Sequence, residues 1–371
     1  MTGAPNRPEI IWTNVVFFSA WTLLTVVAVP WYAIVHGVTW MEIAACILLW
    51  FVTGISITAG YHRLFSHRAY TASAPVRVFF ALFGAAAWEA SIITWSAHHR
   101  FHHRHVDTDN DPYNATAGFW HSHMGWLLTK GAKHDDLSNV PDLWKDPVCA
   151  WQHRNYLAIA IGVNLALTIG LGLLTGHMLG MFVFALLLRG LLLHHFTWLI
   201  NSAAHMWGSQ PWSRGHTARD NWFLSLLTFG EGYHNYHHTF QADYRNGPLW
   251  YNIDVTKWTI WSLSRLGLAR SLRRVPPDVT LGRRFEQARK DLDAILKELD
   301  DRARVALKEH LAPVEQLCED ALSRLEQVRT RLSAGDVPRR ALWTARRTAR
   351  SALRQWQTDL RTQLALVVAS S

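Results

Sequence analysis

Four apolar stretches, each long enough to cross a bilayer, constrain most strongly how this chain can fold. They cover residues 11–35, 41–60, 157–176 and 179–200. A hydrocarbon core of about 30 Å needs about 20 apolar residues per helix, and lipid leaves no partner for unpaired backbone groups. The sequence therefore predicts an all-α membrane protein with four transmembrane helices. Because the run after Arg7 is too long for a signal peptide, we expect it to be a retained span.

A fifth apolar segment, residues 76–95, needs a different placement. It separates His62 and His67 from a second group of histidines, so a crossing would put the two groups on opposite sides of the membrane. We expect this segment to form a helix that lies in the interface or covers a site, with Glu89 facing protein or water.

The basic residues predict which side faces the cytoplasm. The connections at residues 36–40 and 176–179 contain no Lys or Arg, whereas the opposite side carries Arg63, Arg68, Arg77, Arg100, Arg104 and Lys130. By the positive-inside rule that basic side is cytoplasmic and holds both termini, in what we expect to be a bacterial inner membrane. The net charge of +9 then fits an anionic membrane surface, and we expect no nucleic-acid partner.

Three histidine-rich stretches lie on the predicted cytoplasmic side. They contain His62 and His67; His99, His102 and His103; and His234, His237 and His238. On a helix, the H-x-x-H-H spacing places its side chains on one face, where they can converge on a metal. Since one structural zinc takes four ligands, eight imidazoles indicate two metals. For the second stretch read alone, a surface turn that binds nothing is the alternative.

The motifs around these histidines resemble those of the integral-membrane acyl-CoA Δ9 (stearoyl-CoA type) fatty acid desaturases. The resemblance runs from about residue 59 to 277. It rests on four motifs in the same order, namely Gly60-Tyr-His62-Arg-Leu-Phe-Ser-His67, His99-Arg-Phe-His102-His103, Asn201-Ser-Ala-Ala-His205 and Gly230-Glu-Gly-Tyr-His234-Asn-Tyr-His237-His238. It implies a cytosolic helical cap with a di-iron centre, and an O2-dependent oxidoreductase that inserts a cis double bond into a saturated acyl-CoA of about 16 to 18 carbons.

The resemblance also implies the metal ligands and the substrate tunnel. Two iron ions would be held by nine histidines: His62, His67, His99, His102, His103, His205, His234, His237 and His238. Asn201, which shares a helix face with His205, would hold a metal-bound water. Trp95, Thr197 and Trp198 match positions at the bend of the family's acyl tunnel. Trp50, deep in the second span, would cap the far end of the tunnel. The alternative for each tunnel residue is ordinary packing.

Two departures from the family pattern bear on the substrate and the electron donor. His98 stands where animal members have Asp, which leaves open whether the substrate is an acyl-CoA or the acyl chain of a phospholipid. No His-Pro-Gly-Gly haem signature occurs, so we expect a separate ferredoxin-, rubredoxin- or cytochrome b5-like donor with its reductase. A related membrane di-iron hydroxylase, and a metal transporter or receptor, are the alternatives. Product analysis, alkene against alcohol, distinguishes a desaturase from a hydroxylase. O2-dependent NAD(P)H consumption distinguishes either enzyme from a transporter or receptor.

The C-terminal part of the chain differs in composition from the rest. We expect a membrane domain at residues 1–280 and a charged helical extension at 281–371. Leucines at three- to four-residue steps predict helices, and Pro313 and the turn at 333–338 predict a division into three. The last helix is strongly basic. The extension could be a solvated appendage, an oligomerisation element, a dock for an electron donor or a contact with anionic lipid.

Overall fold

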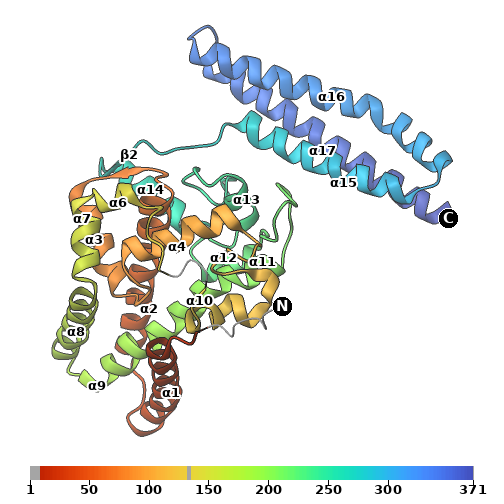
Figure 1. The fold of residues 1–371 in the computed structure, drawn as a ribbon. Coiled ribbons are helices and arrows are strands. Elements are labelled where there is room, and N and C mark those ends of the chain that lie inside the picture. The colour runs from red at the N-terminus through yellow and green to blue at the C-terminus, as the bar shows by residue number, and fades with distance from the viewer. Residues whose placement is uncertain (1–8, 132–134, 371) are drawn as a thin grey trace. The chain divides into compact units, whose positions relative to one another are not determined.

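The computed structural model describes residues 9–131 and 135–370, and side chains up to residue 366. Residues 1–8, at the terminus that we predict to be cytoplasmic, lie outside the described residues. Helices dominate, which confirms the all-α class (Figure 1). The chain forms two compact units, a membrane unit that runs to residue 209 and from 216 to 274, and an extension unit made of residues 210–215 and the chain from Val275.

Among the described residues, four helices are long and apolar enough to cross a membrane, as predicted: Trp12–Val35, Trp40–Ser66, Tyr156–Thr175 and Met178–Met206. The first is α1 (Trp12–Val35), and the second joins α2 (Trp40–Ile55) to the π-helix η1 (Ser56–Ser66). The third is α8 (Tyr156–Thr175). The fourth is continued through α9 (Met178–Met181), η4 (Phe182–Leu188), α10 (Arg189–Asn201) and α11 (Ala203–Met206). At 1.5 Å per residue each reaches about 30 Å or more, the thickness of a hydrocarbon core.

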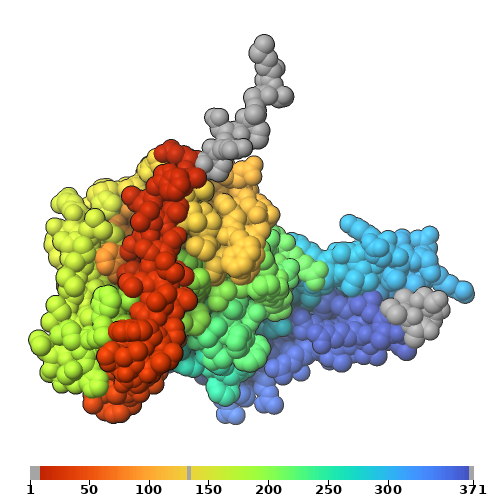
Figure 2. All heavy atoms as spheres, turned by 90° about the horizontal axis from the view of Figure 1, so that it is seen from below, coloured from red at the N-terminus to blue at the C-terminus, as the bar shows by residue number. Residues whose placement is uncertain are grey.

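Apolar side chains cover the outer faces of these spans. On α8, exposed side chains repeat at every fourth residue, namely Leu157, Ile161, Leu165, Ile169 and Leu173. Helix α1 lies along one face of the membrane unit, where Figure 2 shows it in red, and exposes Leu23, Val27 and Ile34. Contiguous apolar surface of this kind marks a contact with a partner or with lipid. These stripes are therefore the surfaces that face the hydrocarbon.

Glycines allow the two short connections on the far side of the spans. Gly37 follows α1 with φ +73°, and Gly176 ends α8 with φ +75°. This left-handed backbone is strained for residues with a Cβ, so glycine is favoured. Helix α2 then starts at a capped end, because Glu42 accepts a hydrogen bond of 2.8 Å from the backbone N–H of Thr39.

Short elements at the other end of the spans form a cap. Its helices and turns are α3 (Ala74–Ala85), α4 (Ile92–His105), η2 (Ala115–Ala117), η3 (His121–Gly125), α5 (Trp126–Leu128), α6 (Pro141–Trp144), α7 (Pro147–Arg154), α12 (Trp222–Leu227), α13 (His234–Thr239) and α14 (Val255–Arg265). Strands β1 (Thr71–Ala72) and β2 (Ala269–Arg270) pair antiparallel, with Thr71 opposite Arg270. This pairing joins the chain just after the second span to the last segment of the unit.

The segment at 76–95 is not one helix, so this part of the prediction was wrong. Helix α3 ends at Ala85, and α4 begins at Ile92 with Ser91 accepting a hydrogen bond from the backbone of Thr94. Between them Trp88 and Ala90 have φ of 61° and 71°, which interrupts the helix. With 12 residues α3 is too short to span a bilayer. The break places Glu89 in a loop.

The extension unit contains three long helices, α15 (Pro277–Glu298), α16 (Asp301–Ser333) and α17 (Arg339–Ser370). They bury a common apolar core that includes Phe285, Leu311 and Trp356. The number of helices agrees with the prediction, but α15 begins before the boundary set at residue 281. Pro313 also lies within α16 instead of ending a helix, and the first break falls between Glu298 and Asp301.

Four spans place both termini on one side and Gly37 on the other, and the positive-inside rule predicts that a reporter fused to the C-terminus reads cytoplasmic while one inserted at Gly37 reads on the opposite side. Gly37 suits the insertion, because a Cβ there would meet nothing within 4 Å. Phosphatase and fluorescent-protein fusions at each position report the side of the membrane on which that position lies. The same reading at both positions would contradict the four-span arrangement.

Candidate metal centre

The π-helix at the end of the second span brings His62 and His67 together. The backbone N–H of His67 donates a hydrogen bond of 3.0 Å to the carbonyl of His62, five residues earlier. In an α-helix, residues five apart point about 140° away from each other. The wider turns of a π-helix, closed by i→i+5 bonds, bring them nearer to one face, and their ring centroids are 4.7 Å apart. Such wide turns are frequent at functional sites. Both imidazoles therefore face the same side.

The nine predicted histidines fall into two groups. The first group contains His62, His67, His99, His103 and His237, and the second contains His102, His205, His234 and His238. Within each group, one ring nitrogen of every residue lies within 4.8 Å of those of the others. Each group could hold one metal ion.

Each H-x-x-H-H stretch contributes to both groups. Helix α4 gives His99 and His103 to the first group and His102 to the second, whereas α13 gives His237 to the first and His234 and His238 to the second. The three residues of each stretch therefore contribute to two groups and not to one. Neighbouring residues on a helix point about 100° apart, so only the i, i+4 pair faces one ion.

Ring nitrogens face one another closely in both groups. In the first, the Nε2–Nε2 distances are 2.8 Å for His67–His99, 3.1 Å for His99–His103, 2.9 Å for His103–His237 and 3.0 Å for His62–His237. In the second they are 3.2 Å for His102–His238 and 3.0 Å for His234–His238.

Acceptors outside the groups fix the ring orientation of three histidines. The Nδ1 of His62 lies 2.9 Å from Glu231, and that of His102 lies 2.8 Å from Asp111. Ionised carboxylates only accept, so each of these Nδ1 atoms carries the hydrogen and its Nε2 keeps a lone pair. The Nδ1 of His205 contacts the hydroxyl of Thr217 at 2.7 Å. Partners of this kind are typical of metal-ligating histidines.

The chemistry of the donor set fits metal ions. Burial holds the pKa of His99, His103, His234 and His237 well below the usual value, so these imidazoles are neutral donors. Among the described residues, the buried Nε2 of His205 has no hydrogen-bond partner. Each Nε2 atom offers either one hydrogen or one lone pair, so the chain of close Nε2 contacts cannot consist of hydrogen bonds alone, and a cation between the rings would take up the remaining lone pairs. Imidazole donors suit iron, zinc, copper and nickel.

A charged network holds Glu231 in place. Its carboxylate accepts hydrogen bonds from Arg63 at 2.8 Å and from Asn246, while Arg63 also pairs with Asp254 at 3.0 Å. Burial alone would raise the pKa of Glu231, but Arg63 and His62 lower it to about 2, so the group is ionised. The sequence showed only the glycines on either side. A Cβ on Gly232 would lie 2.4 Å from the backbone nitrogen of Ser225, so the turn needs glycine there.

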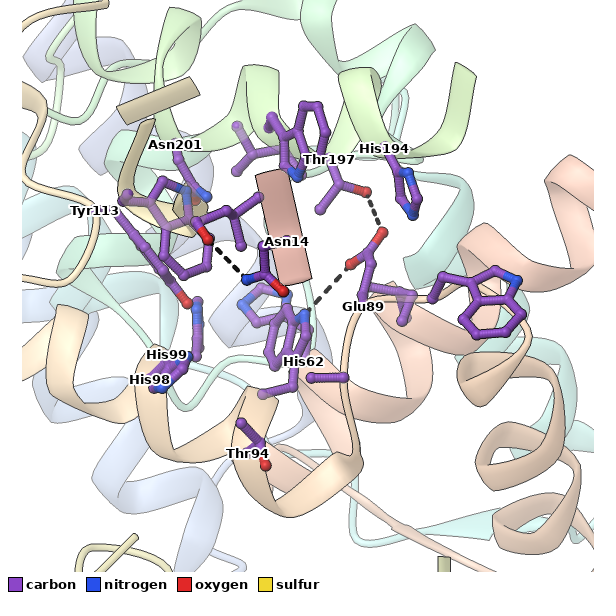
Figure 3. A pocket seen from close by; sticks show the side chains of 18 of the residues that line it. Asn14, His62, Glu89, Thr94, His98, His99, Tyr113, His194, Thr197 and Asn201 are labelled. Atoms are coloured by element: carbon purple, nitrogen blue, oxygen red, sulfur yellow. Dashed lines mark hydrogen bonds between the residues drawn. The ribbon is translucent and has the colours of Figure 1, made fainter. Parts of the chain in front are cut away.

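A largely apolar cavity of about 580 Å³ adjoins the histidines (Figure 3). His62, His99 and His234 form part of its wall. Three of the predicted tunnel residues line it, namely Trp95, Thr197 and Trp198, and so does Asn201. This volume lies within the range of small-molecule sites. The cavity runs in Figure 3 from the side of Tyr113 and Asn201 to the side of Glu89 and His194.

Glu89 connects two walls of the cavity. One carboxylate oxygen accepts a hydrogen bond of 3.3 Å from the indole N–H of Trp95, and the other accepts one of 2.9 Å from the hydroxyl of Thr197 (Figure 3). Burial raises the pKa of Glu89 to about 7. The group is therefore mostly neutral below pH 7, the form that an apolar cavity tolerates best.

Trp50 does not line this cavity, in contrast to the prediction. Its ring packs against Phe229 and Phe196, with centroid distances of 4.6 Å and 5.9 Å. The end of the cavity near Glu89 is instead lined by Phe17 and Trp88, whose ring centroids are 5.7 Å apart. The contribution of the first span was missed, because only three-dimensional packing brings α1 to this place.

Other histidines lie outside both groups. His98 and His194 line the cavity. His123 contacts His195 at 3.1 Å and the hydroxyl of Ser202 at 3.0 Å. Among the described residues, none of these four histidines belongs to either group.

Comparison with known proteins places the chain in a family. The fatty acid desaturase profile matches residues 38–254, which include all nine histidines. A probable acyl-CoA desaturase of Schizosaccharomyces pombe is 44% identical over 67% of this chain and 52% of that protein. Acyl-CoA desaturase 1 of Saccharomyces cerevisiae is 44% identical over 60% and 44%, and sn-2 palmitoyl-lipid 9-desaturase of Nostoc is 37% identical over 73% and 93%. The chain thus spans about half the length of the two yeast relatives. It belongs to the fatty acid desaturase family.

Proposed function

We propose that this protein is an O2-dependent acyl desaturase that inserts a cis double bond at C9 of a saturated acyl-CoA of about 16 to 18 carbons. Two iron ions would occupy the two histidine groups, with Asn201 contributing through a water molecule. The observation that carries this proposal is that histidines of both groups form part of the wall of the apolar cavity. His62 and His99 of the first group and His234 of the second all line the apolar space.

Iron would supply the oxygen activation that no side chain can provide, since the methylene C–H bonds are unactivated. In the overall reaction two C–H bonds break and one C=C bond forms. O2 takes up these two hydrogens, two electrons and two protons and becomes two water molecules. The electrons would come from a separate ferredoxin-, rubredoxin- or cytochrome b5-like protein and its reductase.

The residues of the chain would position the substrate. Trp95 stacks on His99 with a centroid distance of 4.9 Å, so one wall of the cavity lies directly against the first group. Glu89 holds Trp95 and Thr197 on two different elements. A rigid wall at this point fixes which carbons of an alkyl chain approach the histidines, and such positioning decides where the bond forms.

The names of the relatives support acyl-CoA as the favoured substrate. Both yeast relatives are named acyl-CoA desaturases and are 44% identical, whereas the Nostoc protein, named for a lipid-bound palmitoyl chain, is 37% identical. The acyl chain of a phospholipid is therefore the second candidate. We further propose that the histidine side and both termini face the cytoplasm, as the positive-inside rule predicts.

A substrate comparison tests the proposal. Purified protein with iron, a ferredoxin or rubredoxin with its reductase, and O2 is expected to convert stearoyl-CoA to the cis-Δ9 product, with the bond position read by mass spectrometry. Phospholipid-bound stearate is assayed in parallel. Conversion of the phospholipid alone would replace the acyl-CoA assignment, and an alcohol without an alkene would make the protein a hydroxylase.

Removal of a carboxylate that orients a ligand histidine should weaken the binding of only one of the two metal ions. We expect Glu231→Gln to lower the metal affinity of the first group by about 10- to 100-fold, because His62 loses its orienting partner. Asp111→Asn should lower the metal affinity of the second group to the same extent through His102. Metal content per protein after dialysis against graded chelator measures both.

The matched control for these variants is Glu42→Gln. Glu42 is a buried carboxylate that also contacts a histidine, His177, at 2.9 Å, but His177 belongs to neither group. The control should therefore keep both metals. Equal loss of both metals from all three variants would mean that the substitutions act through general destabilisation.

Shortening Phe17 should alter the preferred chain length. We expect Phe17→Ala to shift the products toward longer chains, because it opens apolar volume where the cavity meets α1, while Trp50→Ala leaves the profile unchanged. Product profiles from a mixture of acyl-CoAs of different lengths decide between the two residues. A shift with Trp50→Ala alone would show that the tunnel ends in the second span.

A further inference from the structure

The extension unit carries its charge unevenly. Helices α15 and α16 each have equal numbers of acidic and basic side chains. Helix α17 has one acidic residue, Asp359, and the following arginines: Arg339, Arg340, Arg346, Arg347, Arg350, Arg354 and Arg361. The positive charge of the unit is therefore concentrated on one of its three helices.

Four of these arginines form a straight row. Arg340, Arg347, Arg354 and Arg361 are spaced by seven residues, which on an α-helix is nearly two full turns, and all four are exposed. We call them the arginine row. At 1.5 Å per residue the row is about 32 Å long. The opposite face of α17 is buried in the core of the unit through Ala349, Trp356 and other residues.

Several arginines of α15 and α16 have acidic partners, whereas the row does not. Arg289 pairs with Glu315 and Glu319, and Arg329 pairs with Asp278. Within residues 9–131 and 135–370, no guanidinium of the arginine row forms an ion pair. Arg347 lies over the ring of Trp343, at 5.6 Å from the ring centroid.

We propose that the arginine row docks α17 on the anionic phospholipid headgroups of the membrane that the chain spans. The unit is covalently joined to four helices able to cross a bilayer, so the membrane surface is always within reach of the tether. Basic side chains near an anionic leaflet are attracted to it electrostatically, and tryptophan side chains favour the headgroup region. Trp343 is 61% exposed and lies on the same face as the row.

The shape of the surface favours a lipid over a protein. Protein interfaces have an apolar centre from which charged residues are depleted. Here the exposed face offers arginines along a straight line, interrupted by small polar residues such as Thr344, Ser351 and Thr358. A planar array of phosphates matches a line of charge of this length, and each arginine near an anionic surface strengthens association about fivefold. The proposed docking depends on attachment to the membrane-spanning helices and not on desaturase activity.

The test uses the full chain in bilayer discs with a fluorescent reporter on α17. Ser351→Cys is labelled with an environment-sensitive fluorophore, since Ser351 lies between Arg347 and Arg354 and the native Cys46, Cys149 and Cys318 are buried. Discs of phosphatidylcholine are compared with discs that contain about 30% phosphatidylglycerol. We expect a blue shift only in the anionic discs, lost at salt concentrations that reduce the Debye length well below 10 Å.

Matched variants distinguish an effect of the arginine row from an effect of the net charge of the unit. Arg340→Gln, Arg347→Gln and Arg354→Gln together should weaken the lipid response about a hundredfold, while the corresponding triple Lys variant keeps it. The control changes Arg302, Lys308 and Arg324 to Gln, which removes the same charge from exposed positions on α16, and should keep the response.

Three outcomes would overturn the proposal. They are equal emission in both kinds of disc, equal loss in the α16 control, and a shift that appears only when an acidic redox protein is added. The last outcome would assign the row to a protein partner. Because none of these readouts depends on turnover, an inactive desaturase with a normal lipid response would leave this proposal intact.

Discussion

The close packing of nine imidazoles in a buried space is the constraint on which the rest of the membrane unit depends. Neutral rings whose Nε2 atoms meet at about 3 Å cannot all be paired with one another, so they need cations between them and rigid supports behind them. The histidines come from widely separated parts of the sequence, because His62 ends a span, His102 lies on α4, His205 ends another span and His238 lies on α13. The fold therefore brings four segments to one place.

The carboxylates that contact the ligand histidines explain why the interior of the cap is polar. Arg63 follows His62 directly and contacts Glu231 and Asp254, so the end of the second span is joined to the segments before α13 and α14. Buried charges are costly unless they are paired and hydrogen-bonded, and here each has partners. On the other side, Thr217 links His205 to Asp107, which accepts hydrogen bonds from both its N–H and its hydroxyl.

The sequence was sufficient for features set by local chemistry and insufficient for those set by packing. Apolar length gave the four spans, and histidine spacing with the family resemblance gave all nine candidate ligands. Two metals were expected, but the group to which each histidine belongs was not foreseen, because it depends on the directions of α4 and α13. Trp50 was misplaced because depth in a span says nothing about which neighbour the ring meets. The break at Trp88 and Ala90 was missed because positive φ at non-glycine residues leaves no mark in composition.

The π-helix η1 ties the winding of the second span to the metal centre. Its turns hold more residues than those of an α-helix, and all 11 residues of Ser56–Ser66 are buried. If the same residues were wound as an α-helix, His62 and His67 would point about 140° apart and could not face one ion. A change that relaxed this segment to α geometry would therefore dismantle the first group without replacing a single histidine.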